Sequence, residues 1–186
     1  MLKASTICLA FFILLFQPAA AQTMKTSGYF GIGLRKITES NPGERLNDGQ
    51  DFDGSGYQLA FGVNLNPNVS WEFNLSQDDY DSFDVGTTSL SVEAETIGFS
   101  IIFAADNNAA ATPYFRLGWG NRDASGNATL SSGRSVSLDD AIDSETGLWY
   151  GLGLKFGGSE SAALILESAV IAEDTTAIIF GPQFYF

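Results

Sequence analysis

The sequence contains no histidine, and its single cysteine, Cys8, lies within the first ten residues. Without histidine, a Ser-His-Asp or Cys-His catalytic arrangement is excluded, because each depends on that base. Basic residues are few, nine against 22 acidic, so the basic surface expected of a nucleic-acid-binding protein is missing. Charged residues make up only 17% of the chain and aromatics 13%. This composition also excludes a disordered acidic tail, which would be poor in aromatics.

The first 21 residues have the features of a signal peptide. Lys3 supplies a positive charge, Ile7–Phe16 form a short apolar core, and Ala19-Ala20-Ala21 fits a cleavage site. Because Cys8 lies early in that core and not at its end, lipid anchoring is rejected. We expect residues 1–21 to be removed on export. Residues 22–186 would then form one domain with eight basic and 22 acidic residues, a net charge of −14.

Long hydrophobic runs are also missing beyond the leader, since no stretch approaches the roughly 20 apolar residues of a membrane-spanning helix. Large apolar residues instead recur at every second position, most clearly from Ile178 to Phe186. This period is typical of β-strands with one apolar face. Each run is close to the roughly 9–11 residues that a tilted membrane-spanning strand needs. The eight runs are Gly28–Thr38, Ser55–Leu65, Val69–Gln77, Ser91–Phe103, Pro113–Arg122, Glu145–Phe156, Ser161–Ile171 and Thr175–Phe186.

The two faces of these runs differ in kind. One face is large and apolar throughout, as in Phe115, Leu117 and Trp119, and the other is small or polar, as in Arg116 and Gly118. A one-residue slip would exchange the faces and turn Arg116 toward hydrocarbon, at a cost of about 2–4 kcal/mol near the midplane. We therefore predict an all-β, eight-stranded, antiparallel, up-and-down transmembrane β-barrel with its apolar face outward. Six aromatics near strand ends suit the girdles of such a barrel; they are Tyr57, Trp71, Phe103, Trp119, Phe156 and Phe186.

The connections between runs alternate in length. Three are long and polar, at Glu39–Gly54, Asp78–Leu90 and Asp123–Ser144, and are expected as outer loops. The links at Asn66–Asn68 and Gly157–Glu160 are short, Ala104–Thr112 is intermediate, and Ala172–Asp174 is a short outer link. With both ends periplasmic the strand number is even. Eight strands are preferred to ten, since ten would require an extra hairpin within Asp123–Ser144.

Three segments resemble the small outer-membrane β-barrel family, which includes the transmembrane domain of outer membrane protein A (OmpA), its short OmpX-like relatives and porin-like barrels. They are Tyr29-Phe30-Gly31-Ile32-Gly33, Pro113–Gly120, and the terminal Gly181-x-x-Phe184-x-Phe186. The resemblance implies location in the cell outer membrane, with lipid and lipopolysaccharide around the barrel. It further implies that Gly181, Phe184 and Phe186 form an assembly signal for the barrel-insertion machinery. The periplasmic peptidoglycan-binding domain of longer relatives is not expected.

The main candidate site is an interior charge cluster of Glu72, Arg116, Lys155 and Glu167, two acids and two bases on the small or polar face. One hypothesis is a gated polar path for ions. The other is a charge-paired plug, favoured because an eight-stranded barrel is only wide enough for side chains. Unpaired buried charges would cost several kcal/mol, so the charges must pair. The sequence does not decide which acid meets which base.

Two other patterns carry less chemistry. The Gly-x-Gly pairs at Gly31/Gly33, Gly118/Gly120 and Gly151/Gly153 do not extend to a nucleotide-binding loop, and we expect them to relieve crowding inside the barrel. The acidic group Asp48/Asp51/Asp53 fails the spacing of a calcium loop, and Asp78/Asp79/Asp81/Asp84 form a second acidic group. Loose binding of divalent cations at the cell surface is one hypothesis for them, and solvated, charged loops are the favoured one. No catalytic, cofactor or metal site is predicted.

The predicted function is therefore structural or interactive: a plugged barrel, expected as a monomer, that displays acidic loops for an unknown surface ligand. The alternative is a small-solute or ion channel of porin type. A soluble, lipocalin-like carrier is a third hypothesis, and it is the weakest. It would leave Phe61, Phe73, Phe99 and other large residues on a wet exterior, beyond the few hundred Å² that monomers expose.

Overall fold

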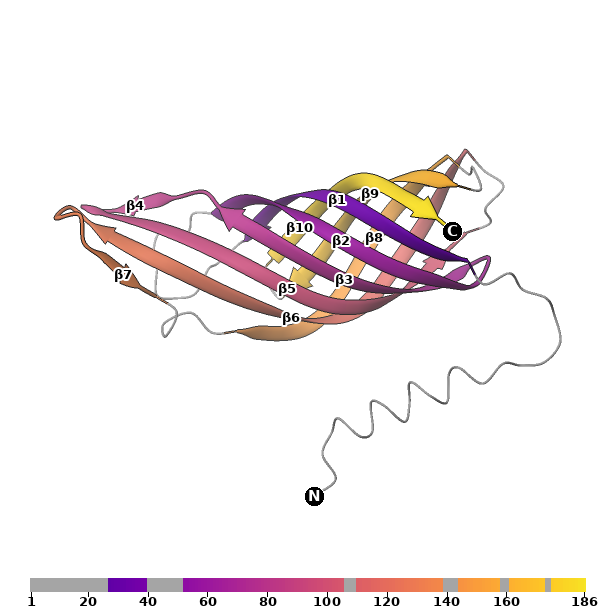
Figure 1. Cartoon of the computed structure of the whole chain (residues 1–186), viewed down its shortest axis with the longest axis horizontal. Coiled ribbons are helices and arrows are strands. Elements are labelled where there is room, and N and C mark those ends of the chain that lie inside the picture. Colours follow the sequence, from indigo (N-terminus) through magenta and orange to yellow (C-terminus); the bar gives the residue numbers. More distant parts are fainter. Residues whose placement is uncertain (1–26, 40–51, 106–109, 139–143, 158–160, 173–174) are drawn as a thin grey trace, which may run out of the picture.

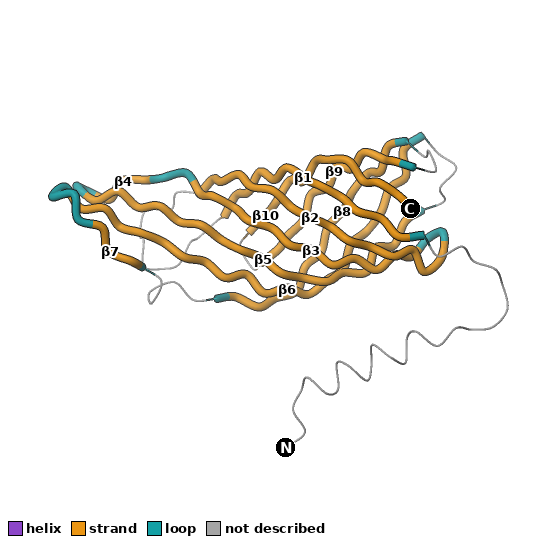
Figure 2. The backbone as a smooth tube through the Cα atoms, viewed as in Figure 1, coloured by secondary structure: helices purple, strands orange, loops and turns teal. Residues whose placement is uncertain are grey.

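A computed structural model describes residues 27–39, 52–105, 110–138, 144–157, 161–172 and 175–186. Strands account for most of this backbone, joined by short turns (Figure 2). No helix among these residues is long and apolar enough to cross a membrane. The ten strands are β1 (Gly28–Glu39), β2 (Phe52–Asn66), β3 (Val69–Tyr80), β4 (Phe83–Val85), β5 (Thr88–Ala104), β6 (Ala111–Leu130), β7 (Ser135–Ser137), β8 (Glu145–Phe156), β9 (Ala162–Ala172) and β10 (Thr175–Tyr185).

Eight of these strands form a closed antiparallel ring. Neighbours along the chain pair in turn, and β10 pairs back onto β1 from Tyr29↔Tyr185 to Glu39↔Thr175. The terminal strands are joined further by Gly28 and Phe186, whose backbone N–H groups each donate to the other's carbonyl at 3.0 Å. Figure 1 shows the resulting tilted barrel. The eight-strand prediction is confirmed; the predicted leader, residues 1–21, lies outside the described residues.

The exterior is apolar because side chains alternate between the two sides of each strand. On β6, Phe115, Leu117 and Trp119 are 39–49% exposed, whereas Arg116 between them is 3% exposed. The same alternation on β10 exposes Ile178, Phe180 and Phe184 and buries Ile179 and Gln183. Large apolar residues on the outside of a closed barrel are stable only against an apolar surrounding.

Two of the predicted outer loops are largely strand, which corrects the sequence-based boundaries. In Asp78–Leu90, β3 continues to Tyr80, β4 follows, and β5 already begins at Thr88. In Asp123–Ser144, β6 runs to Leu130 and β7 pairs with it. The outward apolar residues end within the predicted strands, at Leu75, Ile97 and Trp119, but backbone pairing continues through the polar residues beyond the predicted boundaries. The third loop, Glu39–Gly54, has residues 40–51 outside the described part; its described ends, Glu39 and Phe52–Gly54, belong to β1 and β2.

The paired strands β5 and β6 therefore project past their neighbours. Pairing of β3 with β5 ends at Asp79↔Glu93, and pairing of β6 with β8 ends at Arg122↔Glu145, while β5 and β6 stay paired to Thr88↔Leu130. The short strands β4 and β7 flank this projection at the end of the molecule remote from the C-terminus (Figure 1). We call residues 83–95 and 123–137 the extension; its base, residues 93–95, is still paired with β3. β4 and β7 belong to it and not to the barrel ring.

The bore also contains a large apolar layer that the sequence interpretation missed. Its members are buried side chains of β8, β9 and β10: Trp149, Ile165, Ala169, Ile171, Ala177 and Ile179. The expectation of an inward face that is small or polar throughout was wrong here. Inward positions that do not face a charged partner can hold a large apolar side chain. Such a side chain fills the bore without burying a polar group that lacks a hydrogen-bond partner, which would cost free energy.

Candidate functional site

The central contact of the bore is a fork between Arg116 on β6 and two carboxylates. The Nη1 atom of Arg116 donates to Oε1 of Glu72 on β3 at 2.5 Å. Its Nη2 atom donates to Oε2 of Glu167 on β9 at 3.0 Å, and Nε lies 2.6 Å from Oε1. All three side chains are at most 4% exposed. The guanidinium therefore bridges strands from different parts of the wall by charge-assisted bonds, which are about twice as strong as neutral ones.

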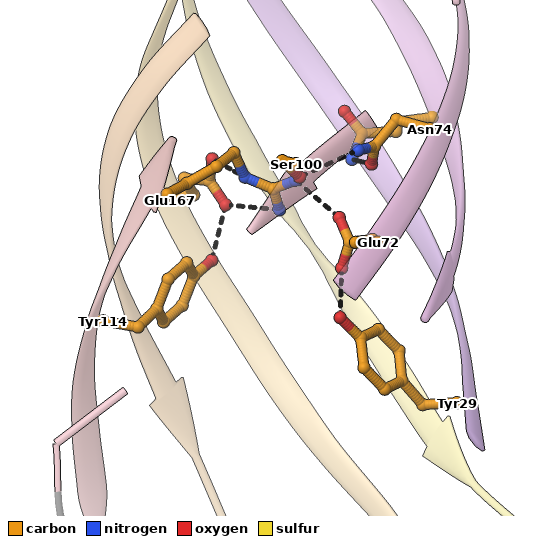
Figure 3. Close-up of polar contacts among 8 residues, drawn as sticks. Tyr29, Glu72, Asn74, Ser100, Tyr114 and Glu167 are labelled. Atoms are coloured by element: carbon orange, nitrogen blue, oxygen red, sulfur yellow. Dashed lines mark hydrogen bonds and ion pairs between the residues drawn. The ribbon is translucent and has the colours of Figure 1, made fainter. Parts of the chain in front are cut away.

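Two tyrosines complete the coordination of these carboxylates. The hydroxyl of Tyr29 donates to Glu72 Oε2 at 2.7 Å, and that of Tyr114 donates to Glu167 Oε2 at 2.6 Å. Figure 3 shows Tyr29 and Tyr114 reaching the pair from separate positions on the wall. Ser100 also accepts a bond from Arg116 Nη1 at 2.8 Å. Each carboxylate thus has several partners, which offsets the desolvation cost of burying charge.

Of the four residues predicted as the interior cluster, Glu72, Arg116 and Glu167 form this network by direct contact. The Lys155 ammonium lies beyond ion-pair distance of both carboxylates but still interacts electrostatically with Glu72. Lys155 is half-buried on β8, and its Nζ lies 5.6 Å from the ring centre of Tyr185 in a cation–π contact. The network therefore has two acids and one base. The expectation of two acids meeting two bases was wrong in that detail, because Lys155 lies at the end of β8 where Tyr185 of β10 faces it.

Two further charged levels lie in the bore and were not predicted. Arg35 Nη1 lies 3.3 Å from Asp78 Oδ2, with both side chains at most 1% exposed. Arg122 Nη2 donates to Glu39 Oε2 at 2.8 Å and to the Tyr80 hydroxyl at 2.5 Å. The prediction of Asp78 as a solvated loop residue was wrong. Asp78 continues the series of inward-facing residues Glu72, Asn74 and Ser76 at every second position. The alternation of β3 in the sequence was therefore enough to predict that Asp78 faces inward.

Three aromatic rings of the bore lie against interior glycines. An added Cβ at Gly98 or Gly120 would fall 2.6–2.7 Å from the ring of Trp149. At Gly62 and Gly153 it would overlap the rings of Tyr29 and Tyr114. The space left by these missing side chains is occupied by specific aromatic rings. This is the physical reason for the predicted role of the interior glycines in relieving crowding. The pairs at Gly118/Gly120 and Gly151/Gly153 lie within strands, and no nucleotide loop is formed there.

The acidic groups outside the bore are exposed. Asp79, Asp81 and Asp84 are exposed, and Asp48 and Asp51 lie outside the described residues. Asp53 accepts a hydrogen bond from the Thr38 hydroxyl at 2.8 Å and pairs with Lys36 at 3.2 Å. The bond from Thr38, followed by the contact with Lys36, lowers the pKa of Asp53. Within the described part of the chain no group of three or more acidic or thiol side chains is arranged to hold a metal ion.

Of the three residues of the predicted assembly signal, Gly181 and Phe184 lie on the closing strand β10, and Phe186 directly follows it. Phe184 and Phe186 point outward and are 46% and 83% exposed, and Gly181 is buried against the backbone of Ile32 on β1. A Cβ at Gly181 would overlap the Ile32 carbonyl oxygen, so this position requires glycine for the close approach of β10 to β1. Their role in assembly stays a prediction.

A closed eight-stranded barrel with an apolar exterior and a charge-paired bore defines an integral outer-membrane barrel protein. The chain belongs to the family of the outer membrane protein beta-barrel domain, whose model matches residues 7–175. No curated protein matches the sequence.

Solved structures share the fold at low identity. Ail, the attachment invasion locus protein of Yersinia pestis, is 17% identical with a TM-score of 0.60, covering 88% of this chain and all of that one. A major outer membrane protein from Thermus thermophilus is 11% identical with a TM-score of 0.59, covering 86% and 99%. Neisserial surface protein A is 14% identical with a TM-score of 0.57, covering 85% and 95%. These similarities establish the fold and leave the role open.

Proposed function

We propose that the protein is an exported outer-membrane barrel that keeps its bore closed and presents the extension at the cell surface for contact with other molecules. The observation that carries this proposal is the extension itself. Its strands remain hydrogen-bonded beyond the last barrel pairings, at Asp79↔Glu93 and Arg122↔Glu145. The base of the extension forms a buried cluster with the barrel, in which Ala94 and Ala124 join Ile37 and Tyr80. The rest protrudes, and protruding segments on a rigid scaffold commonly bind.

Closure of the bore is supported by successive obstructions along β6. Arg116 is held by two carboxylates, Gly120 is covered by the Trp149 ring, and Arg122 is held by Glu39 and Tyr80. An eight-stranded barrel leaves room for little besides side chains. The Arg116 and Arg122 contacts join strands that are not adjacent, and the Trp149 ring on β8 also covers Gly98 on β5, which is not adjacent to β8. The wall and the plug therefore stabilise one another.

The charge of the exposed outer side chains limits the surface partner. Asp79, Asp81, Asp84, Glu93 and Asp123 are exposed, against one exposed base in the extension, Arg134. One structure of Ail was solved with the heparin analogue sucrose octasulfate. A polyanion of that kind would be repelled here, so we expect a neutral or cationic surface partner.

A register-matched deletion tests the surface role. Removing residues 90–93 together with 125–128 deletes opposite pairs from Leu90↔Ala128 to Glu93↔Ser125 and preserves inward and outward parity. We expect the barrel to assemble normally, as measured by its folded mobility on unboiled gels, while attachment of cells to host-cell or abiotic surfaces falls. Protease should cut the intact extension on whole cells. Unchanged attachment, or an extension protected on whole cells, would contradict the proposal.

A conducting barrel is the second candidate, and one observation favours it. The donors of Arg35, and both oxygens of Asp78, have no hydrogen-bond partner within the described residues beyond their 3.3 Å ion pair. Buried groups bonded so sparsely require water, so this level of the bore would be hydrated. Single-channel recording in planar bilayers separates the candidates. Stable conductance steps would favour the channel, and their absence in active preparations would favour the plug.

A further inference from the structure

A hollow of about 190 Å³ lies in the outer surface of the wall, where β2, β3 and β5 lie side by side. Its membrane side is a row of three directly paired apolar residues, Leu59, Leu75 and Ile97. Its outer side is the next outward row, Tyr57, Gln77 and Glu95. The Tyr57 hydroxyl donates to Gln77 Oε1 at 2.5 Å, and Glu95 is the charged group of this rim. The hollow is therefore apolar on one side and bounded by a carboxylate on the other.

Four carboxylates lie in two adjacent rows at and beside the outer rim of the hollow. Glu95 of β5 lies directly opposite Asp123 of β6, and Glu93 lies directly opposite Asp79 of β3. All four are exposed, and none of them forms an ion pair within the described residues. Like charges directly opposite one another destabilise a sheet. An occupant that neutralises these carboxylates is therefore favoured.

Charge also decides between the possible occupants of the hollow. Phospholipids and lipid A carry phosphate, which the four carboxylates repel, and a second copy docked through this face would bring its own carboxylates against them. The exposed bases in the described part of the chain do not neutralise the rows. Lys36 pairs with Asp53 at 3.2 Å, and Arg134 lies in the turn before β7, about 20 Å beyond Asp123 along the strand. The hollow therefore favours an occupant that is both apolar and cationic.

We propose that the hollow and the two rows of carboxylates bind a cationic amphipathic peptide. An apolar side chain of the peptide enters the hollow, and its lysine or arginine side chains lie along the rows. Directly opposite residues of the sheet have Cβ atoms about 4.5–5.5 Å apart, and alternate residues along a strand are about 7 Å apart. Side chains three or four positions apart on a helix are about 5–6 Å apart, so several can pair at once. An amphiphile with a single amine would meet only one carboxylate.

The order of polarity along the wall matches the way in which such a peptide lies at a membrane surface. An interfacial amphipathic helix places its apolar face at the boundary between head groups and acyl chains and its cationic face toward water. Here the apolar row lies on the membrane side of the hollow, and the carboxylates lie on its outer side. The inference deepens the proposed function by naming a class of partner for the base of the extension. It rests on that proposal for the direction in which this end of the barrel faces.

Peptide titrations of the folded mature chain in uncharged detergent test the inference, with empty micelles as background. The main probe is a helical peptide of leucine and lysine with one apolar and one cationic face. The comparison probes are a scrambled peptide of the same composition, oligolysine, and lipid A.

Two pairs of variants separate charge from the hollow. Glu95→Gln removes the carboxylate at the rim, and its control is Asp84→Asn, an exposed acid on β4 whose partner Ser89 lies about 20 Å from Glu95 along β5. Leu75→Trp fills the hollow, and its control is Phe73→Trp, at the preceding outward position of β3 and outside the hollow. Folded mobility on unboiled gels establishes that each variant is a barrel.

We expect the amphipathic peptide to bind at least about tenfold more tightly than the scrambled peptide or oligolysine, because only it fills the hollow and pairs with the rows together. An exposed ion pair contributes up to about fivefold, so Glu95→Gln should weaken this binding about two- to fivefold and Asp84→Asn by less. Leu75→Trp should weaken it about tenfold and leave oligolysine binding unchanged. Phe73→Trp should change neither.

Four results would overturn the inference: equal affinity for the amphipathic and scrambled peptides, equal losses in either variant and its control, tighter binding of lipid A than of the peptide, or self-association through this face. Each would leave the proposed function standing if attachment still falls when the extension is shortened. Protection of the extension from protease on whole cells would instead overturn both, because this end of the barrel would then not face outward.

Discussion

Three aromatic side chains of the bore cover glycines, mainly of neighbouring strands, and these contacts set how tightly the barrel is packed. Trp149 covers Gly98 and Gly120, while Tyr29 and Tyr114 lie over Gly62 and Gly153. An aromatic ring against a glycine buries backbone that would otherwise be bare. The tyrosines also carry hydroxyls to the two central carboxylates. Packing and charge neutralisation in the bore are therefore properties of the same few residues.

Substituting Gly120→Ala tests this packing. The new Cβ would lie 2.6 Å from the Trp149 ring, so we expect the free energy of unfolding to fall by about 1–3 kcal/mol. Urea titration of the barrel in lipid measures it. Gly147→Ala is the matched control, because no heavy atom lies within 4 Å of its Cβ, and its stability should stay within about 0.5 kcal/mol. The cost at Gly120 should shrink in a Trp149→Leu background, where the 3.1 Å contact of the new Cβ with the Ile97 carbonyl oxygen remains; an equal cost there would contradict the contact with Trp149.

Removing Arg116 tests the central network. Arg116→Met leaves Glu72 and Glu167 buried and unpaired, and breaking such a pair costs about 3–5 kcal/mol. We expect that loss in urea unfolding at neutral pH, with partial recovery when both glutamates become glutamine. Lys155→Met, which removes a bore cation outside the network, should cost less than about 1 kcal/mol. Equal losses of unfolding free energy in the two variants would show that the network contributes no more to stability than an isolated cation in the bore.

At the scale of strands, the C-terminal strand both closes the ring and carries the predicted assembly signal. We expect Phe186→Ala to lower the amount of protein in the outer membrane severalfold, while refolding of purified chain into detergent stays efficient. The backbone bonds between residue 186 and Gly28 do not need the side chain. Phe180→Ala, an outward-facing phenylalanine on the same strand, is the control. Similar losses of membrane protein for both would assign the effect to lipid contact and not to recognition.

The sequence predicts the barrel strands well because one rule, alternation, governs all of them. It places the eight barrel strands and the direction of Arg116, Glu72 and Glu167 correctly. The alternation rule fails where the outward positions of a strand change from apolar to polar residues. The predicted strand Ser91–Phe103 already includes the outward residues Glu93 and Glu95, but β5 begins earlier, at Thr88, and β6 continues past Arg122 to Leu130 through polar outward residues, where the sequence predicts loops. The pairing of Arg116 with both glutamates, and the separation of Lys155, depend on strand tilt and stagger around the ring. A single sequence does not contain those quantities.

At the scale of the whole molecule, the arrangement is inverted relative to a soluble protein: charges lie inside and large apolar residues outside. Its tryptophans report on both regions. Trp119 faces outward and is 49% exposed, while Trp149 lies in the bore and is 4% exposed. In lipid bilayers with brominated acyl chains, we expect a variant with Trp119 as its sole tryptophan to be strongly quenched. A variant that keeps only Trp149 should be quenched several-fold less, because the wall separates its ring from the acyl chains. Fluorescence in brominated and unbrominated bilayers of equal thickness supplies the comparison. Strong quenching of Trp149 would mean that its side chain contacts lipid. The assignment of the inward and outward side chains of β8 would then be wrong.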